Sequence, residues 1–509
     1  MKYHRSSKAV RRSGGYDPDA LISSYDLKAD EVSSVKKTVL DAVKPHPAER
    51  AKLEEVRERL LKEVAEAAAG LGETEVYPVS VGSAARSTWL RGNHDIDIFI
   101  SFPGTLSKEE LTVRGCAVAE KVAETADHRE DRHSEHPYIH IRKYGFEIDL
   151  VPCFRVPDAS CIKSAVDRTP FHCRFIKERI AGREDDVLLL KQFMKGAGVY
   201  GSEVRNRGFS GYASELLVIF YGSFDEVIKA AAQWKPGVFI DIMDHGNVSF
   251  DDPLVMIDPT DPGRNVSAAL SLDRFMKLAD HARAFIRRPD VSFFFREKTL
   301  PYSDEEILSV FEKRGTYFTA VRFRSPKKAD DTLYPQLFRM ENSVRETLEN
   351  NDFKVISTLS YGDDEECIIL IELLSGLLPP VRVKDGPPVS VHPNSDAFRE
   401  KYVAAGDTYS IFIRNGCYIA EIPRRYRTPE SVIRDKTGTE IALGKHIKEA
   451  LSDGFDILSG GEILKIGSDG FRTALRETME RTLPERSAAG QKSLSGESDF
   501  SECLPIKYL

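Results

Sequence analysis

Apolar residues recur along the first third of the chain at two spacings, which predict where helices and strands lie. A helical spacing runs over residues 27–43 and again over 48–69, and Gly70-Leu71-Gly72 ends the second helix. Shorter apolar or alternating segments predict four strands and one intervening helix: strands 76–81, 96–102, 139–142 and 145–151, and helix 108–126. We expect a sheet with the first two helices packed on its back.

Beyond residue 164 the pattern becomes helical, and residues 316–378 then alternate strand, helix, strand and strand. A proline-rich linker and further strands and turns follow. The other predicted elements are a loop over 196–201, a buried helix over 214–221, a helix capped by Asn265 or Ser267, and helices over 446–451 and 470–483. The pattern predicts a chain of several α+β parts.

The composition is that of an ordinary soluble protein, with 509 residues, 41% hydrophobic and 30% charged. No apolar run predicts a membrane span, and the basic N-terminus MKYHRSSKAVRR lacks the apolar core of a secretory signal. The seven cysteines include no C-x-x-C pair, which favours a reducing cytoplasm over a disulfide framework. The net charge of −8 is unexpected for a nucleic-acid-binding protein but does not exclude one, because local clusters of charge decide binding.

The segment VGSAARSTWLRGNHDIDIFISF carries the most specific chemistry. Asp95 and Asp97 alternate with isoleucines, so both carboxylates face one side of a predicted strand. Carboxylates this close repel each other unless a cation lies between them, and Mg²⁺ prefers oxygen ligands of this kind. Ser83 and Arg86 begin a predicted helix that runs to Leu90, whose free N–H groups suit a phosphate. The alternative is an exposed strand with two solvated aspartates.

The motif Gly-Ser, eleven residues, Asp-Ile-Asp resembles the nucleotidyltransferase superfamily of DNA polymerase β. That superfamily uses a third carboxylate on a later strand, and Asp149 in FEIDLVP lies at the matching place. The segments SAVDRTPFHCRFIKERI and DDVLLLKQFMKGAGVYGSEVRNRGFSGYASELLVIFYGSF look like the archaeal (class I) CCA-adding enzyme, a tRNA nucleotidyltransferase. The resemblance implies that Asp95, Asp97 and Asp149 are catalytic and hold two Mg²⁺ ions.

The resemblance also implies an α+β multidomain fold with a polymerase β-type nucleotidyltransferase head, a helical neck, a small α/β body and a C-terminal tail domain. The expected parts are a basic N-terminal extension (1–24), the head (25–155), the neck (156–288), the body (289–378), a tRNA-contacting tail (379–484) and a disordered C-terminus (485–509). The implied activity is addition or repair of the 3′-terminal CCA of tRNA from CTP and ATP without a nucleic-acid template. The implied partners are the acceptor end and TΨC arm of tRNA, and a second copy of the chain in a homodimer.

Several positions match residues that line the incoming nucleotide in the family: Thr169, His172, Lys191 and Tyr200. Their chemistry agrees, because a lysine offers phosphates a point charge and a tyrosine can stack or donate a hydroxyl. The resemblance implies that Arg264 helps to choose CTP and ATP over GTP and UTP. The alternative is a surface arginine paired with Asp261.

Two basic clusters suit contacts with RNA: Arg322 and Arg324 near a strand end, and Arg424, Arg425 and Arg427 around Tyr426. Rows of solvated charge are the alternative for both. The histidine-rich segment DHREDRHSEHPYIHIR matches no zinc spacing, so we expect a polar loop that leads into a strand. Two other functions stay open: another template-independent enzyme of the superfamily, such as a poly(A) polymerase or oligoadenylate synthetase, and a non-catalytic RNA-binding protein.

Overall fold

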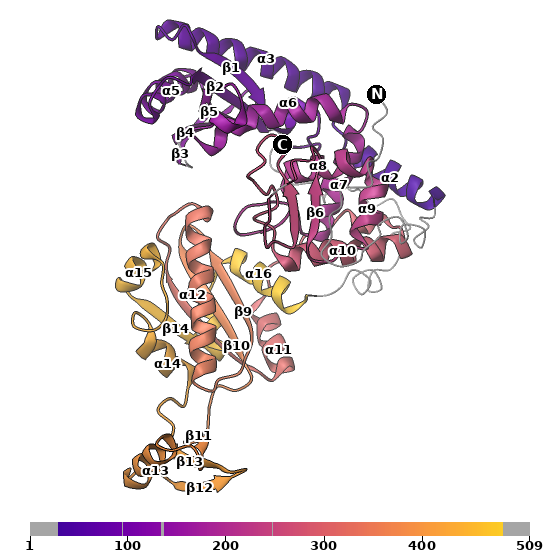
Figure 1. The fold of residues 1–509 in the computed structure, drawn as a ribbon. Helices are drawn as coiled ribbons and strands as arrows, with labels where there is room; N and C mark the ends of the chain where they lie inside the picture. The colour runs from indigo at the N-terminus through magenta and orange to yellow at the C-terminus, as the bar shows by residue number, and fades with distance from the viewer. Residues whose placement is uncertain (1–28, 94, 134–136, 247, 482–509) are drawn as a thin grey trace. The chain divides into compact units, whose positions relative to one another are not determined.

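The computed structural model describes residues 29–93, 95–133, 137–246 and 248–481, which form two compact units (Figure 1). The first unit runs to Lys298 and the second from Thr299 to Arg481. The predicted extension at 1–24, the predicted disordered end at 485–509 and His136 lie outside the described residues. Within the described part, no helix is both long and apolar enough to cross a membrane.

The first unit begins with a mixed five-stranded sheet in the order β1-β2-β5-β4-β3. Its strands are β1 (Tyr77–Val81), β2 (Asp95–Pro103), β3 (His128–His133), β4 (Pro137–Lys143) and β5 (Phe146–Arg155). Strands β2 and β5 are parallel, and all other pairs are antiparallel. Helices α3 (Pro47–Gly70) and α5 (Lys108–Ala123) cover one face, where Ile96, Ile98 and Ile100 enter the core as predicted.

Three local predictions for this sheet were wrong. The expected polar loop includes β3, an edge strand that pairs with β4 although every residue in it is polar or charged. The helix expected to reach Leu90 is the five-residue α4 (Gly82–Arg86), which ends because Ser87 adopts a left-handed conformation with φ of 59°. Helix α2 (Ala29–Val43) does not cover the sheet: its buried valines join the core of the helical part that follows.

The helical part of the first unit packs around one large apolar core. Its elements are α6 (Thr169–Ile180), α7 (Glu184–Ala197), α8 (Gly211–Tyr221), α9 (Phe224–Ala231) and α10 (Leu272–Arg287), the 3-10 turns η1 (Ala159–Cys161), η2 (Ala165–Arg168) and η3 (Val291–Phe293), and the parallel strands β6 (Val238–Asp241) and β7 (Leu254–Ile257). Ser271 caps α10, so the predicted caps Asn265 and Ser267 were wrong. The side-chain oxygen of Asn265 instead accepts a hydrogen bond from the backbone N–H of Met256.

The second unit is built on an antiparallel sheet in the order β14-β8-β10-β9, with helices on both faces. The strands are β8 (Tyr317–Arg324), β9 (Val355–Gly362), β10 (Glu366–Leu373) and β14 (Phe455–Ser459). The helices are α11 (Asp304–Arg314), α12 (Asp330–Asn350), α14 (Pro429–Lys436), α15 (Lys445–Ser452) and α16 (Asp469–Met479), with the 3-10 turn η4 (Gly460–Lys465). Figure 1 shows the long helix α12 crossing this sheet.

A smaller sheet completes the second unit. Its strands β11 (Val381–Pro388), β13 (Cys417–Pro423) and β12 (Ser410–Arg414) lie in that order, and α13 (Asn394–Ala404) packs on one side. The chain then returns to the larger sheet, where β14 pairs with β8. The structure therefore differs from the expected tail over 379–484, because residues from α14 onward pack with the body.

Candidate active site and nucleotide pocket

Parallel pairing of β2 with β5 brings the predicted catalytic carboxylates together. Asp97 lies opposite Asp149, and Asp95 lies opposite Glu147. Because side chains alternate along a strand, all three aspartates face away from the side covered by α3 and α5. Burial and the charges of Asp149 and Asp95 raise the pKa of Asp97 to about 6, against the opposing charge of Arg86. A concentration of negative charge of this kind favours a cation.

Gly82 explains the glycine of the Gly-Ser motif. Its φ is +72°, and a Cβ atom placed on it would lie 1.8 Å from Oδ2 of Asp97. Only glycine therefore lets α4 begin directly beside this carboxylate. Ser83 is half-buried in the same short helix.

A histidine that the sequence interpretation left without a role contacts the third carboxylate. His140 on β4 pairs with Asp149 across the sheet, and its Nδ1 lies 2.7 Å from Oδ1 of Asp149. Its Nε2 lies 2.9 Å from Oε2 of Glu147. Cross-strand register could have revealed this contact, because His140 and Asp149 face the same side of neighbouring strands.

The donor set fits a hard divalent cation, although no group of three His, Cys, Asp or Glu side chains within the described residues already has the arrangement of a metal site. The like-charge effect on the pKa of Asp97 is the observation that supports the fit. Asp149 already contacts His140 through one oxygen, so a cation would share this carboxylate with the histidine.

The predicted phosphate ligands Arg86 and Lys191 lie in a buried polar cluster around Glu215 of α8. Nε of Arg86 donates to Oε1 of Glu215 at 3.0 Å, and the Thr88 hydroxyl donates to the same oxygen. Nζ of Lys191 donates to the Thr88 carbonyl at 2.8 Å and lies 3.7 Å from Oε1 of Glu215. Burial lowers the pKa of Lys191 to about 8. Both cations are thus engaged inside the protein.

A second lysine on α7, which the sequence interpretation missed, lies within electrostatic range of Asp95. Lys195 lies one helical turn after Lys191 and is half-buried. Burial lowers its pKa, while the charge of Asp95 acts in the opposite direction. Its Nζ lies 5.5 Å from the ring centre of Tyr200, whose own pKa is raised by burial. The i, i+4 spacing of the two lysines was the available signal.

Two of the remaining predicted nucleotide ligands, His172 and Arg264, contact Asp258, which directly follows β7. Nε2 of His172 lies 2.8 Å from Oδ2 of Asp258, and Nη1 of Arg264 lies 2.9 Å from the same oxygen. The alternative expectation, that Arg264 pairs with Asp261, was wrong, because Asp261 accepts a hydrogen bond from Arg168 instead. Thr169 begins α6, the helix that carries His172.

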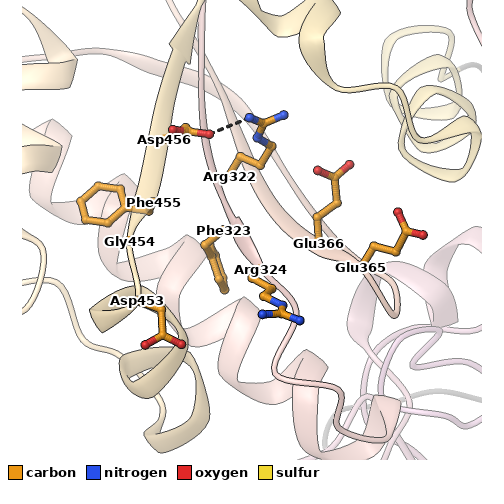
Figure 2. A pocket seen from close by; sticks show the side chains of 9 residues that line it. All are labelled: Arg322, Phe323, Arg324, Glu365, Glu366, Asp453, Gly454, Phe455 and Asp456. Atoms are coloured by element: carbon orange, nitrogen blue, oxygen red, sulfur yellow. Dashed lines mark hydrogen bonds and ion pairs between the residues drawn. The ribbon is translucent and has the colours of Figure 1, made fainter.

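The predicted RNA-binding arginines fall into two groups by exposure. Arg324, Arg425 and Arg427 are exposed. Arg322 lines a groove of about 530 Å³ beside β8 and forms an ion pair with Asp456 at 2.6 Å. Figure 2 shows this ion pair among the side chains that line the groove. Arg424 pairs with Asp352, so it connects the small sheet to the end of α12.

Comparison with protein families assigns the regions of the chain to one kind of enzyme. Residues 52–172 match the nucleotidyltransferase domain, residues 185–295 the second domain of tRNA nucleotidyltransferase, and residues 314–460 the C-terminal domain of the CCA-adding enzyme. The fold and the site thus define a nucleotidyltransferase of the polymerase β type.

Comparison with full-length relatives identifies the family within this class. The CCA-adding enzyme of Methanosarcina barkeri is 50% identical over 443 residues, which are 87% of this chain and 97% of that protein. The CCA-adding enzyme of Haloarcula marismortui is 37% identical over 458 residues, again 87% of this chain and 97% of that protein. The chain belongs to the archaeal CCA-adding enzyme family, and its activity is template-independent addition of CCA to tRNA.

Solved structures give a weaker likeness. The crystal structure of the Cid1 poly(U) polymerase matches with a TM-score of 0.40 and 14% identity, covering 53% of this chain and 99% of that one. The structure of CdnC with ATP from E. coli matches with a TM-score of 0.40 and 17% identity, covering 52% and 94%. These similarities are too low to inform the roles of individual residues.

Proposed function

We propose that Asp95, Asp97 and Asp149 are the catalytic carboxylates of this CCA-adding enzyme and its ligands for two Mg²⁺ ions. The observation that carries the proposal is the register of β2 and β5, which sets Asp97 beside Asp149. When bound, such ions lower the pKa of an attacking hydroxyl and neutralise charge on the triphosphate. The proposed chemistry is in-line attack by the tRNA 3′-hydroxyl on the α-phosphate of the nucleotide, with release of pyrophosphate.

The triphosphate-binding residues in this proposal are Ser83, Lys195 and Tyr200. Lys195 is a cation that interacts electrostatically with Asp95, so it is well placed to neutralise phosphate beside the carboxylates. Arg86 and Lys191 support the pocket from inside, because both are engaged with the cluster around Glu215. Arg86 and Lys191 would then affect nucleotide binding indirectly, because they fix the position of α4.

The base lies, in this proposal, against Thr169, His172 and Arg264. The side chain of Arg264 is 37% exposed, so it can reach a ligand while it holds Asp258. The guanidinium offers several donors in one plane, which suits the acceptor atoms of cytosine or adenine. Selection of CTP and ATP would follow from these contacts.

For tRNA we propose that the exposed arginines Arg324, Arg425 and Arg427 contact the phosphates of the acceptor end and the TΨC arm. Arg425 is the strongest candidate, since its side chain is 71% exposed although it pairs with the partly exposed Asp435 at 3.1 Å. The side chains of Arg322 and Arg424 are only 27% and 12% exposed and pair with Asp456 and Asp352, so they would contribute less. Phosphate contacts of this kind supply affinity that falls with salt.

We further propose that the enzyme works in the cytoplasm as a homodimer. The cysteines within the described residues are free, which agrees with a reducing compartment. Light scattering of the purified chain at several concentrations tests the dimer, and a monomer throughout would contradict it.

The test of the proposed function is incubation of tRNA lacking its terminal CCA with each of the four nucleotides in turn and in pairs. CTP alone should add two residues, ATP alone none, and both together the complete CCA. Long adenylate tails from ATP alone would favour a poly(A) polymerase. Binding of the tRNA without any addition at saturating Mg²⁺ would favour a non-catalytic protein.

A further inference from the structure

Four ionisable side chains form a row across the sheet of the first unit. Asp97 on β2 lies opposite Asp149 on β5, Asp149 lies opposite His140 on β4, and His140 lies opposite Glu130 on β3. Residues directly opposite one another on neighbouring strands point to the same face of a sheet. His140 is therefore the immediate neighbour of Asp149 on the side away from Asp97.

The imidazole of His140 is held at both ends of its ring. Nδ1 lies 2.7 Å from Oδ1 of Asp149, and Nε2 lies 2.9 Å from Oε2 of Glu147. The side chain of His140 is only 12% exposed, whereas that of Asp149 is 32% exposed. Two contacts on opposite edges of a rigid ring fix both its place and its plane. The more exposed Asp149 thus contacts a side chain whose orientation is fixed.

This contact gives the two oxygens of Asp149 different roles. Oδ1 is engaged by the ring, while Oδ2 forms no hydrogen bond to any residue that the structure describes. Strand β5 lies between β2 and β4, so the ring approaches Asp149 from one side and Asp97 lies on the other. A cation shared with Asp97 then binds one oxygen of Asp149. Chelation by both oxygens would require loss of the His140 contact.

Binding through one oxygen matters because divalent cations differ in the carboxylate geometry that they accept. Mg²⁺ demands near-ideal octahedral geometry, which the narrow bite of a chelating carboxylate distorts, whereas Ca²⁺ takes carboxylates with one oxygen or with both. A carboxylate restricted to one oxygen therefore favours Mg²⁺ over Ca²⁺. Side chains that orient a metal ligand through a hydrogen bond commonly change metal affinity or activity by about 10- to 100-fold.

We propose that His140 is a positioning residue for the catalytic cation: it holds Oδ1 of Asp149, restricts this carboxylate to one oxygen and so favours Mg²⁺ over Ca²⁺, while Glu147 holds the ring in place. The proposal rests on the proposed carboxylate cluster and adds to it the residue that sets its cation preference. His140 touches neither the cation nor the nucleotide in this account.

The experiment measures cation binding by the full-length chain without tRNA or nucleotide. Bound Mn²⁺ is followed by loss of the EPR signal of free Mn²⁺, and displacement by Mg²⁺ or Ca²⁺ gives the ratio of the Ca²⁺ to the Mg²⁺ dissociation constant. We expect His140→Ala to lower this ratio by about tenfold, because Asp149 regains its second oxygen. The control is His128→Ala, an exposed histidine that lies opposite Arg142, which should leave the ratio unchanged.

Addition of C to tRNA lacking CCA gives a second readout. His140→Ala should lower kcat in Mg²⁺ by about tenfold or more and change the KM for CTP much less, because the histidine acts on the cation ligand rather than on the nucleotide. His140→Asn carries an amide N–H near the place of Nδ1. Its kcat and its cation ratio should therefore lie between those of wild type and His140→Ala.

A merely structural role for His140 would weaken the binding of both cations equally and leave the ratio at the wild-type value, which overturns the proposal. A ratio in His140→Asn no higher than in His140→Ala would also overturn it, because the amide should restore the contact with Asp149. If His140→Ala does not fold, Glu147→Ala decides, since it removes the support of the ring and should lower the ratio in the same direction. A wild-type ratio in that variant would overturn the proposal.

A double substitution tests whether His140 acts through Asp149. In an Asp149→Ala background, His140→Ala should no longer change the ratio, because residues that act through a shared contact are not additive. A full effect in that background would show that the histidine acts independently of Asp149, which overturns the proposal. Turnover by Asp149→Ala itself would instead contradict the proposed function, so the two failures are distinguishable.

Discussion

Replacing Asp97 with asparagine should stabilise the metal-free protein while it removes catalysis. Burial and the charges of Asp149 and Asp95 raise the pKa of Asp97 from 3.8 to about 6. In the unfolded chain this carboxyl ionises near its usual pKa, so the folded state binds more protons between pH 4 and 6, and stability falls as pH rises through this window. The shift corresponds to about 3 kcal/mol, and partial exposure of the side chain reduces this to about 2 kcal/mol.

The assay is urea unfolding in EDTA, followed by tryptophan fluorescence from pH 4 to 8. The chain has two tryptophans, Trp89 and Trp234, and both are buried in the first unit, so the signal reports on the unit that holds Asp97. The advantage of Asp97→Asn should be absent at pH 4, grow to pH 6 and then stay constant. Mg²⁺ should stabilise the wild type and have less effect on the variant.

The control is Asp131→Asn, an exposed aspartate paired with Arg129, which should change the free energy of unfolding by less than about 0.5 kcal/mol. An Asp97→Asn protein that is less stable than wild type at pH 7.5 would refute the reasoning, as would an advantage that does not depend on pH. Either result would mean that burial and the neighbouring carboxylates do not raise the pKa of Asp97 in the folded protein.

Three further predictions concern charged residues in the two units. Glu215→Gln should lower the free energy of unfolding by about 3 kcal/mol, because it leaves buried cations without a counter-charge. The same change at the half-buried Glu226, which pairs with Lys229, should cost under about 1 kcal/mol, and equal losses would contradict the buried cluster. Lys195→Ala should raise the KM for CTP and ATP about tenfold in steady-state addition, with unchanged tRNA affinity, and an unchanged KM would exclude it from the triphosphate site. Arg425→Ala should weaken tRNA binding in filter assays and reduce the salt dependence of binding by about one counterion. Arg424→Ala should instead lower mainly the stability of the protein. The reverse pattern would contradict the proposal that the more exposed arginine binds tRNA.

The parts of the fold that follow from local pattern could be predicted from the sequence. The alternation of Asp95 and Asp97 with isoleucines fixes both the strand and the face of each side chain, because the side-chain period of a strand is two. Helix α2 shows the limit. Its apolar face predicts a helix, but nothing in that pattern says which core the face joins, and it packs with α7 rather than with the sheet.

Long-range pairing accounts for most of the remaining differences. Strand β14 joins β8 across more than a hundred residues, so its place in the body sheet has no local signal. In the site, Glu215 lies in a helix that is otherwise apolar nearly all round, and only the fold reveals that it binds Arg86 and Lys191. A short polar edge strand such as β3 escapes prediction because its backbone pairing, rather than apolar burial, stabilises it.

The central claim is that three carboxylates on neighbouring strands act as one catalytic cluster. Its most direct test is CMP addition to tRNA lacking CCA by Asp149→Ala, with the affinity for that tRNA measured in parallel. Asp149 is opposite Asp97 in the sheet, so its loss should abolish addition and leave tRNA binding nearly intact. Turnover near the wild-type rate in this variant would contradict the account.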